Sequence, residues 1–474
     1  MTTIFPKARY YITVAAFMLM LLGGGISVLS PQMLIVVSST SLVLLALWLV
    51  EFRDGFATRQ AAWLSLLVGF AGVVIAAQLV PLPQSVWSVL PGRGFVSDAL
   101  KVSGQTDVWL PLTLDTLQTR NVLISLLPGL AFFVVGQKLT TKQSWSFCCC
   151  FIAFAIFGVV LGLAQRFLGI NSGLYPYVEV GNGLATGTFR NRNNFAASLY
   201  VSIPFLFALA LSYLQRIEKR AVLIMIATLV YLSVIVAGLA ASASRSGMLL
   251  SMAAILLSMA MAYGLKPEGR FENNRAGVTK FALASFLVFI LVFSQVGVLA
   301  IMRLAETDAM NDQRWIIWAK SFESAASFFP AGSGFGTFVP VYQLIEKPAD
   351  MFEGMFVNHA HNDWLELVLE GGLAMALILF AFLFWYVTAT GAAWSQSKIW
   401  GALLVPRAAS ISALLLMLHS LVEFPLRNPA LMSSFALCLG LIAVAGKHRR
   451  ELQGGQRREK PGFAGNGSLP KFKD

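Results

Sequence analysis

Charged residues are scarce in this sequence. They make up 12% of the 474 residues, whereas hydrophobic residues make up 57%, and the mean hydropathy is +0.72. Soluble globular proteins carry about 25% charged residues, so the composition argues against one. The formal net charge is +12, but the basic residues are dispersed among short loops rather than gathered on one face. We therefore expect no nucleic-acid binding.

Cysteine and histidine are also rare, with four of each. Cys148, Cys149 and Cys150 are consecutive inside one apolar run and Cys438 lies in another, which is typical of small buried apolar side chains. This pattern predicts no disulfide framework and no metal cluster. His359 and His361 are close in sequence, but a third metal ligand at a regular spacing is missing. We expect neither a metal nor another cofactor.

Long apolar runs, in contrast, recur along nearly the whole chain. Runs of roughly 17 to 25 residues can cross a hydrocarbon core of about 30 Å. The predicted spans are 10–29, 31–50, 61–80, 118–136, 145–168, 193–214, 221–241, 247–264, 280–301, 364–388, 406–423 and 429–446. The sequence thus predicts an all-α integral membrane protein with about twelve transmembrane helices, over residues 1–446. Residues 447–474, rich in glycine and charge, are predicted to be a disordered cytoplasmic tail.

The first run resembles a secretory signal because it follows Lys7 and Arg9. It is long for a signal and a second span follows at once, so we expect a retained helix. Placing the N-terminus inside puts most basic loops in the cytoplasm, in agreement with the positive-inside rule, and twelve spans place both termini there. The other side then receives three long segments, 81–117, 169–192 and 302–363. Long loops positioned by a rigid scaffold commonly carry function.

The segment 302–363, between the ninth and tenth predicted spans, is the largest of these loops. Apolar residues at helical spacing predict a short helix near 312–328, which Pro330 would end. We expect this segment to form a small, partly folded lid. The glycines at 332, 334 and 336 would let the backbone turn tightly or approach a ligand. The run lacks the Lys-Ser/Thr ending of a nucleotide-binding loop, so we expect no ATP site.

The stretch 358–366 is the strongest candidate for chemistry. Asp363 and Glu366 resemble a helix capping pair, which would place His361 just before a helix at the membrane surface. A histidine can exchange a proton with a substrate hydroxyl because its ordinary pKa lies near 6.5. Alternatively, His361 only caps or packs at the interface.

Arginines on the same side form the second candidate set: Arg190, Arg192, Arg245, Arg303 and Arg314. A guanidinium group suits phosphate because its forked donors make paired, charge-assisted bonds. Arg245 is a lone charge between two apolar spans, where a charge is costly. The alternative is that these side chains reach lipid headgroups.

A weaker set lies near the outer end of the eleventh span. His419, Glu423 and Arg427 follow one another at one-turn spacing, so one helical face could direct them at a common cavity. Pro425 interrupts that helix, which leaves the position of Arg427 open.

Several motifs occur in a particular order. An Arg and Trp helix, a Pro, a glycine run ending in Phe, and His-x-His-Asn before a span are formed by Arg314, Trp318, Pro330, Gly332, Gly334, Gly336, Phe338, His359, His361 and Asn362. Gly187-Thr188-Phe189 and Ser244-Arg245-Ser246 precede them. This order resembles the O-antigen ligase and O-antigen polymerase superfamily of bacterial envelope glycosyltransferases, over about residues 180–388. One departure is Leu373, where ligases often carry a small residue.

The resemblance implies a multi-pass enzyme of the bacterial inner membrane with its active site facing the periplasm. Such enzymes take a glycan from an undecaprenyl-pyrophosphate carrier, without a metal. They attach it to a growing polysaccharide, as polymerases, or to lipid A core, as ligases. His361 would activate the acceptor, with arginines 190, 192, 245 and 314 around the pyrophosphate. His359, Asn362, Glu366, Gly332 and Gly334 would support the site.

Two other functions use a similar lipid-linked sugar. A transporter or flippase could also bind it with buried arginines, but transporters often consist of two related halves, and the sequence shows no such repeat. A protein O-oligosaccharyltransferase would transfer the same donor to Ser or Thr. The motifs do not separate this enzyme from a polymerase or a ligase.

Overall fold

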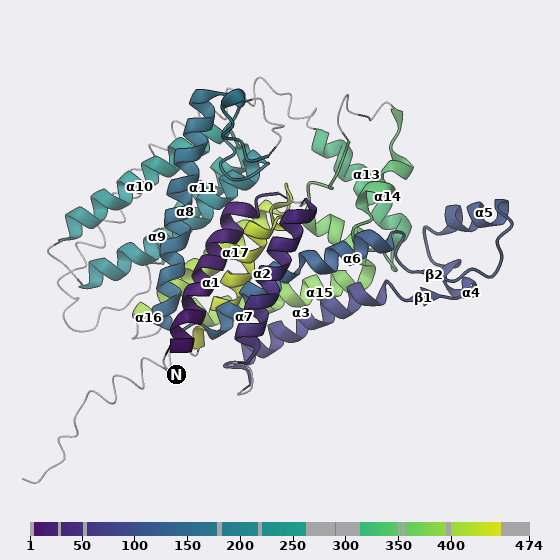
Figure 1. The fold of residues 1–474 in the computed structure, drawn as a ribbon, viewed down its shortest axis with the longest axis horizontal. Coiled ribbons are helices and arrows are strands. Elements are labelled where there is room, and N and C mark those ends of the chain that lie inside the picture. Colours follow the sequence, from purple (N-terminus) through teal and green to yellow (C-terminus); the bar gives the residue numbers. More distant parts are fainter. Residues whose placement is uncertain are drawn as a thin grey trace, which may run out of the picture.

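The computed structural model describes residues 4–26, 30–50, 55–177, 183–216, 220–261, 290, 313–348, 351, 356–394 and 400–446. In these ranges the chain is a multi-pass, all-α membrane protein with a single pair of two-residue strands (Figure 1). Seven helices there are long and apolar enough to cross a membrane, and three apolar helices are shorter.

Helices coincide with all predicted spans that fall within these ranges. They are α1 (Ile4–Gly23), α2 (Pro31–Leu49), α3 (Arg59–Ala77), α6 (Thr116–Ser125), α7 (Leu127–Lys138), α8 (Thr141–Leu168), α9 (Arg192–Arg216), α10 (Ala221–Ser242), α11 (Arg245–Ala260), α15 (Asp363–Trp394), α16 (Trp400–His419) and α17 (Pro429–Ala443). The ninth predicted span, 280–301, lies outside the described ranges except for residue 290. The number of twelve spans and their orientation in the membrane therefore remain predictions.

The fourth predicted span consists of two helices. α6 ends at Ser125, and α7 begins at Leu127 with Pro128 in its first turn. Proline lacks the N–H that a continuous helix would require at this position, and it is well tolerated at a helix start. The two helices together still form one candidate membrane span, Thr116–Lys138, with a break at Leu126.

α9 is the most deeply buried of the long helices and packs against α8, α10, α11 and α16. Its large side chains at Tyr200, Phe205 and Phe207 are fully buried. α17 packs along α7, where a Cβ added at Gly136 would lie 2.7 Å from the Leu437 carbonyl oxygen. Small residues allow this close approach of two membrane helices.

Two smaller substructures lie at one end of the bundle, on the right of Figure 1. The first contains β1 (Pro81–Leu82) paired antiparallel with β2 (Leu110–Pro111), and helices α4 (Gln84–Trp87) and α5 (Gly94–Val102) between them. The second contains α13 (Gln313–Phe328) and α14 (Phe338–Ile345). The helix predicted near 312–328 is therefore confirmed from residue 313 onward. The closing motion expected of a lid stays a prediction.

Two single-turn 3-10 helices complete the described elements. η2 (Ile170–Ser172) follows α8, and η7 (Pro425–Arg427) lies in the connection 420–428 between α16 and α17. This second connection contributes to the site described next.

Candidate active site

The glycine run after α13 packs closely against α15 and against the loop that contains Thr113. Gly332, Gly334 and Gly336 have positive φ angles of 82°, 109° and 82°, which glycine adopts without strain. A Cβ at Gly334 would clash with the Thr113 side chain, and one at Gly332 would lie 2.5 Å from the Glu370 carbonyl oxygen. The sequence suggested two roles for these glycines, a tight turn or a close approach to a ligand. The structure shows a tight turn that packs closely against neighbouring residues of the protein.

His361 lies in the loop that enters α15. Its φ angle is 49°, in the left-handed region that costs a non-glycine residue about 1–3 kcal/mol. The Trp318 indole N–H donates to the His361 carbonyl oxygen at 3.3 Å, and the ring lies edge-on to Phe424 with centroids 5.0 Å apart. The His361 side chain is 26% exposed. It is therefore held in place yet remains accessible.

Three predicted supporting residues hold this loop. Glu366, one turn into α15, pairs with His359 Nδ1 at 2.9 Å and accepts the Ala360 N–H at 2.8 Å. Asn362 Oδ1 accepts the Leu365 N–H at 3.1 Å, so Asn362 caps the helix. The predicted Asp363 and Glu366 capping pair is wrong, because α15 begins at Asp363 and the cap position falls to Asn362.

Glu423 lies at the centre of the site. It comes from the connection 420–428, and its side chain is 1% exposed. Oε2 lies 3.2 Å from His361 Nδ1, and Oε1 accepts bonds from Arg314 and from the Asn193 amide. Burial acts to raise the pKa of Glu423, but the His361 hydrogen bond and the charges of His361 and Arg314 hold it below its ordinary value of 4.5. Glu423 is therefore a carboxylate at neutral pH.

The starts of α9 and α11 meet beside this carboxylate. The Ser244 hydroxyl donates to Asn193 Oδ1 at 2.7 Å and accepts the Gly247 N–H at 3.1 Å, which caps α11. Arg192 is the first residue of α9 and Arg245 is the first residue of α11. The structure thus brings Arg192, Arg245 and Arg314 to the surroundings of Glu423.

The remaining two candidate arginines are Arg190 and Arg303. Arg190 precedes α9, its side chain is exposed, and its backbone N–H donates to the Gly25 carbonyl oxygen at 3.1 Å. Arg303 lies outside the described residues.

A second buried ion cluster adjoins the loop of His361. The Arg427 guanidinium lies 3.1 Å from Asp363, 3.2 Å from Glu366 and 3.8 Å from Glu370. Burial acts to lower the pKa of Arg427, but these carboxylates outweigh it and raise the pKa above the ordinary value. Removing one partner from a buried ion cluster costs about 3–5 kcal/mol. Arg427 thus anchors the start of α15.

His419 lies one turn before Glu423, whose backbone N–H donates to the His419 carbonyl oxygen at 3.0 Å. α16 ends at His419, so the three residues do not form one helical face. The His419 side chain is fully buried between the Tyr200 hydroxyl at 2.8 Å and the Ser246 hydroxyl at 3.1 Å. The common cavity suggested by their one-turn spacing therefore stays a prediction. Glu423 contacts His361, and Arg427 contacts the start of α15.

The sequence placed Glu423 and Arg427 only in the weaker candidate set, and it indicated no role for Asn193. A signal was present, since Glu423 and Arg427 are charges flanking Pro425 between two apolar runs. In the part of the chain that the structure describes, no group of three or more His, Cys, Asp or Glu side chains could hold a metal ion.

No curated protein matches the chain. A match to a protein family covers residues 227–381, which include Arg245, Arg314 and His361 but neither Arg192 nor Glu423. The matched family is the O-antigen ligase family, and this confirms the resemblance of the chain to the O-antigen ligase and polymerase superfamily.

Proposed function

We propose that the protein is an inner-membrane glycosyltransferase that transfers a glycan from an undecaprenyl-pyrophosphate carrier to an acceptor sugar at the periplasmic face. Members of the matched family are glycosyltransferase-like ligases and polymerases, which in general use a lipid-linked glycan donor and a polysaccharide acceptor. The carrier, the side of the membrane and the residue roles below are part of the proposal.

The contact between His361 Nδ1 and Glu423 Oε2, at 3.2 Å, carries this proposal. A carboxylate can only accept a hydrogen bond, so Nδ1 of a neutral His361 must bear the proton. Nε2 then carries the lone pair. An imidazole oriented in this way can remove the proton of an acceptor hydroxyl. Glu423 would hold the ring in this tautomer and stabilise the imidazolium that forms.

The bond changes of the proposed step balance without another reactant. The acceptor oxygen forms a bond to the anomeric carbon of the donor, and its proton moves to His361 Nε2. The bond between that carbon and the pyrophosphate oxygen breaks, and the lipid pyrophosphate leaves with the electron pair. The proton on His361 then passes to solvent, which restores the base.

Arginines would stabilise the charge that grows on the leaving pyrophosphate. Arg192 and Arg245 begin helices whose N-termini meet near Glu423, and a helix N-terminus also favours an anion. Arg314 contacts Glu423 and is 26% exposed at its side chain. We assign Arg314 to both the carboxylate and the pyrophosphate. Arg190 would contact the donor from the surface.

A reconstituted transfer assay tests the proposal. An undecaprenyl-pyrophosphate oligosaccharide and a candidate acceptor are added to purified protein in liposomes. The masses of the products are then measured by mass spectrometry. A ladder of repeat units identifies a polymerase, and a single addition to core lipid identifies a ligase. Glycan on a Ser or Thr of an added protein would instead indicate protein glycosylation. Movement of the donor across the bilayer without a new bond would contradict the proposal in favour of a transporter.

A further inference from the structure

An apolar groove of about 200 Å³ lies between α15, α16 and α17. Leu367, Leu379 and Phe382 of α15 line one side of it. Met417 of α16 and Phe435 of α17 line the other side. α15 is among the helices long and apolar enough to cross a membrane, and α16 and α17 are shorter apolar helices. The groove therefore has the chemistry of a site for a hydrocarbon chain.

One end of the groove reaches the buried ion cluster. Asp363 and Ser420 line this end and are joined by a hydrogen bond of 3.0 Å, while Arg427 pairs with the same carboxylate at 3.1 Å. Trp364, also in the lining, donates its indole N–H to the Met417 carbonyl oxygen at 3.1 Å. The polar groups at this end therefore already have protein partners, and the apolar walls continue from there.

The same end adjoins the candidate active site along two chain segments. Asp363 follows His361 by two residues, and Leu426, which lines the groove, follows Phe424 by two residues. Phe424 lies against the His361 ring. A molecule with its polar head at His361 and its apolar tail in this groove would need no long connection between the two.

We infer that this groove binds the first isoprene units of the donor lipid. The inference rests on the proposed function. The bond that breaks joins a sugar to pyrophosphate, and the other end of that pyrophosphate carries the isoprenoid. The tail therefore begins one pyrophosphate length from the reacting carbon, and its site must adjoin the base. The acyl chains of a lipid A-core acceptor are separated from the acceptor hydroxyl by several sugars, so they do not meet this requirement.

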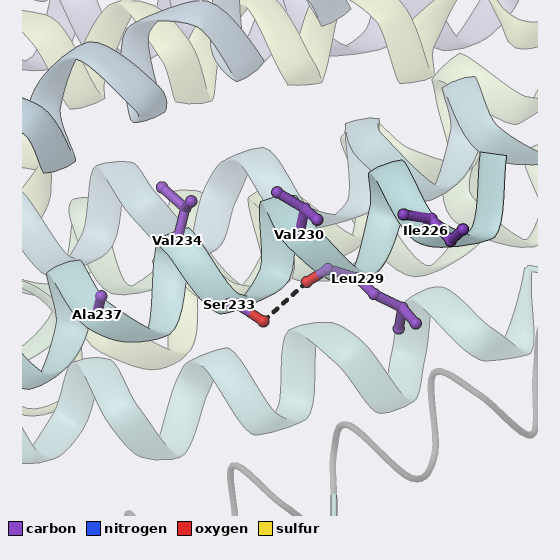
Figure 2. Close-up of a pocket in the computed structure, with 6 residues that line it drawn as sticks. All are labelled: Ile226, Leu229, Val230, Ser233, Val234 and Ala237. Atoms are coloured by element: carbon purple, nitrogen blue, oxygen red, sulfur yellow. Dashed lines mark hydrogen bonds between the residues drawn. The ribbon is translucent and has the colours of Figure 1, made fainter. Parts of the chain in front are cut away.

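A second apolar groove, along α10, has no such connection to the site. Its six lining residues run from Ile226 to Ala237 and all belong to one helix (Figure 2). The single polar side chain among them, Ser233, donates its hydroxyl to the Leu229 carbonyl oxygen at 3.0 Å. At about 440 Å³ this groove is the larger one. It provides a matched control for lipid contact without proximity to His361.

Filling the groove gives the first test. Leu379→Trp places a larger side chain in the groove, and Val230→Trp does the same on α10. Each variant is assayed in detergent with a donor of full isoprenoid length and a donor with a two-isoprene tail. Leu379→Trp should raise KM for the long-tail donor about tenfold or more, with a smaller effect for the short tail. Val230→Trp should change neither. Equal KM values for Leu379→Trp and wild type with the long-tail donor would overturn the inference.

Photolabelling of the wild-type protein gives a second test that needs no turnover. A polyprenyl pyrophosphate with a diazirine on its first isoprene unit should label peptides that contain Leu379, Met417 or Phe435. Excess polyprenyl phosphate should suppress the label, whereas excess phosphatidylglycerol should not. Labelling of α10, or suppression by phosphatidylglycerol, would overturn the inference. Labelling of the groove in a protein that forms no glycosidic bond would retain the lipid site and reject the proposed function.

Discussion

The substitution Glu423→Gln tests the centre of the site with almost no change in shape. The glutamine side chain has nearly the same volume, but it has no charge and offers one acceptor oxygen in place of two. In the protein, one carboxylate oxygen faces His361 and the other faces Arg314 and Asn193. A glutamine can direct its oxygen to only one of these sides. Its NH2 group then meets donors on the other side.

The size of the effect follows from these contacts. A hydrogen bond to a charged group contributes about 1.5–3 kcal/mol, and a buried donor left without an acceptor costs about 1–3 kcal/mol. A positioned general base contributes about 10²–10⁴-fold to the rate, and a thousandfold loss corresponds to about 4 kcal/mol of barrier. We therefore expect kcat of Glu423→Gln to fall about a thousandfold.

Steady-state transfer in liposomes measures this loss, with donor and acceptor varied separately. The control is Glu323→Gln, which makes the same chemical change at an exposed position of α13. KM for the acceptor should change much less than kcat, because Glu423 acts on the base and not on the sugar. A Glu423→Gln protein that retains kcat within a few-fold of wild type would refute the role of this carboxylate.

Three further predictions concern other parts of the structure. Arg245→Ala should weaken use of the lipid-linked donor. Arg245→Lys should recover part of this activity, because lysine keeps the charge but lacks the forked donors of the guanidinium group. Wild-type activity in both variants would indicate that Arg245 contacts only lipid headgroups. Gly334→Ala should lower the free energy of unfolding by at least about 2 kcal/mol, because φ is 109° and the new Cβ would clash with Thr113. The measurement is Tm, and the control is Gly94→Ala, whose new Cβ would have no neighbour within 4 Å. Equal Tm values for Gly334→Ala and wild type would contradict the predicted strain. The folded-state pKa of Glu423 lies below 4.5, so its stabilising effect is lost as the pH falls through this lower folded value. The Tm difference between wild type and Glu423→Gln should therefore shrink as the pH falls below 4.5. A difference that grows on acidification below this pH would contradict the assignment.

The sequence was sufficient to predict the long apolar helices of the described ranges and the histidine loop. Apolar runs of spanning length determine helices in lipid, because every backbone polar group must be paired within the segment. The helix start after His361 was predicted from local residues, although the capping position was displaced to Asn362. These features depend on neighbours in the chain, which a single sequence contains.

The partners of Glu423 could not be predicted in the same way. His361, Arg314 and Asn193 are 62, 109 and 230 residues away along the chain. Only the packing of helices brings them together, and no local periodicity encodes that packing. Likewise, α16 ends at His419, so the charges that follow it lie in the connection 420–428 and not on a continuous helix.

The most direct measurement is formation of the glycosidic bond by His361→Ala beside wild type. Both proteins are reconstituted at equal amounts with the same undecaprenyl-pyrophosphate oligosaccharide, and bound donor and new product are quantified by mass spectrometry. Wild type should form product, and His361→Ala should bind the donor but form no product. Product from His361→Ala at the wild-type rate would contradict the assignment of His361 as the base.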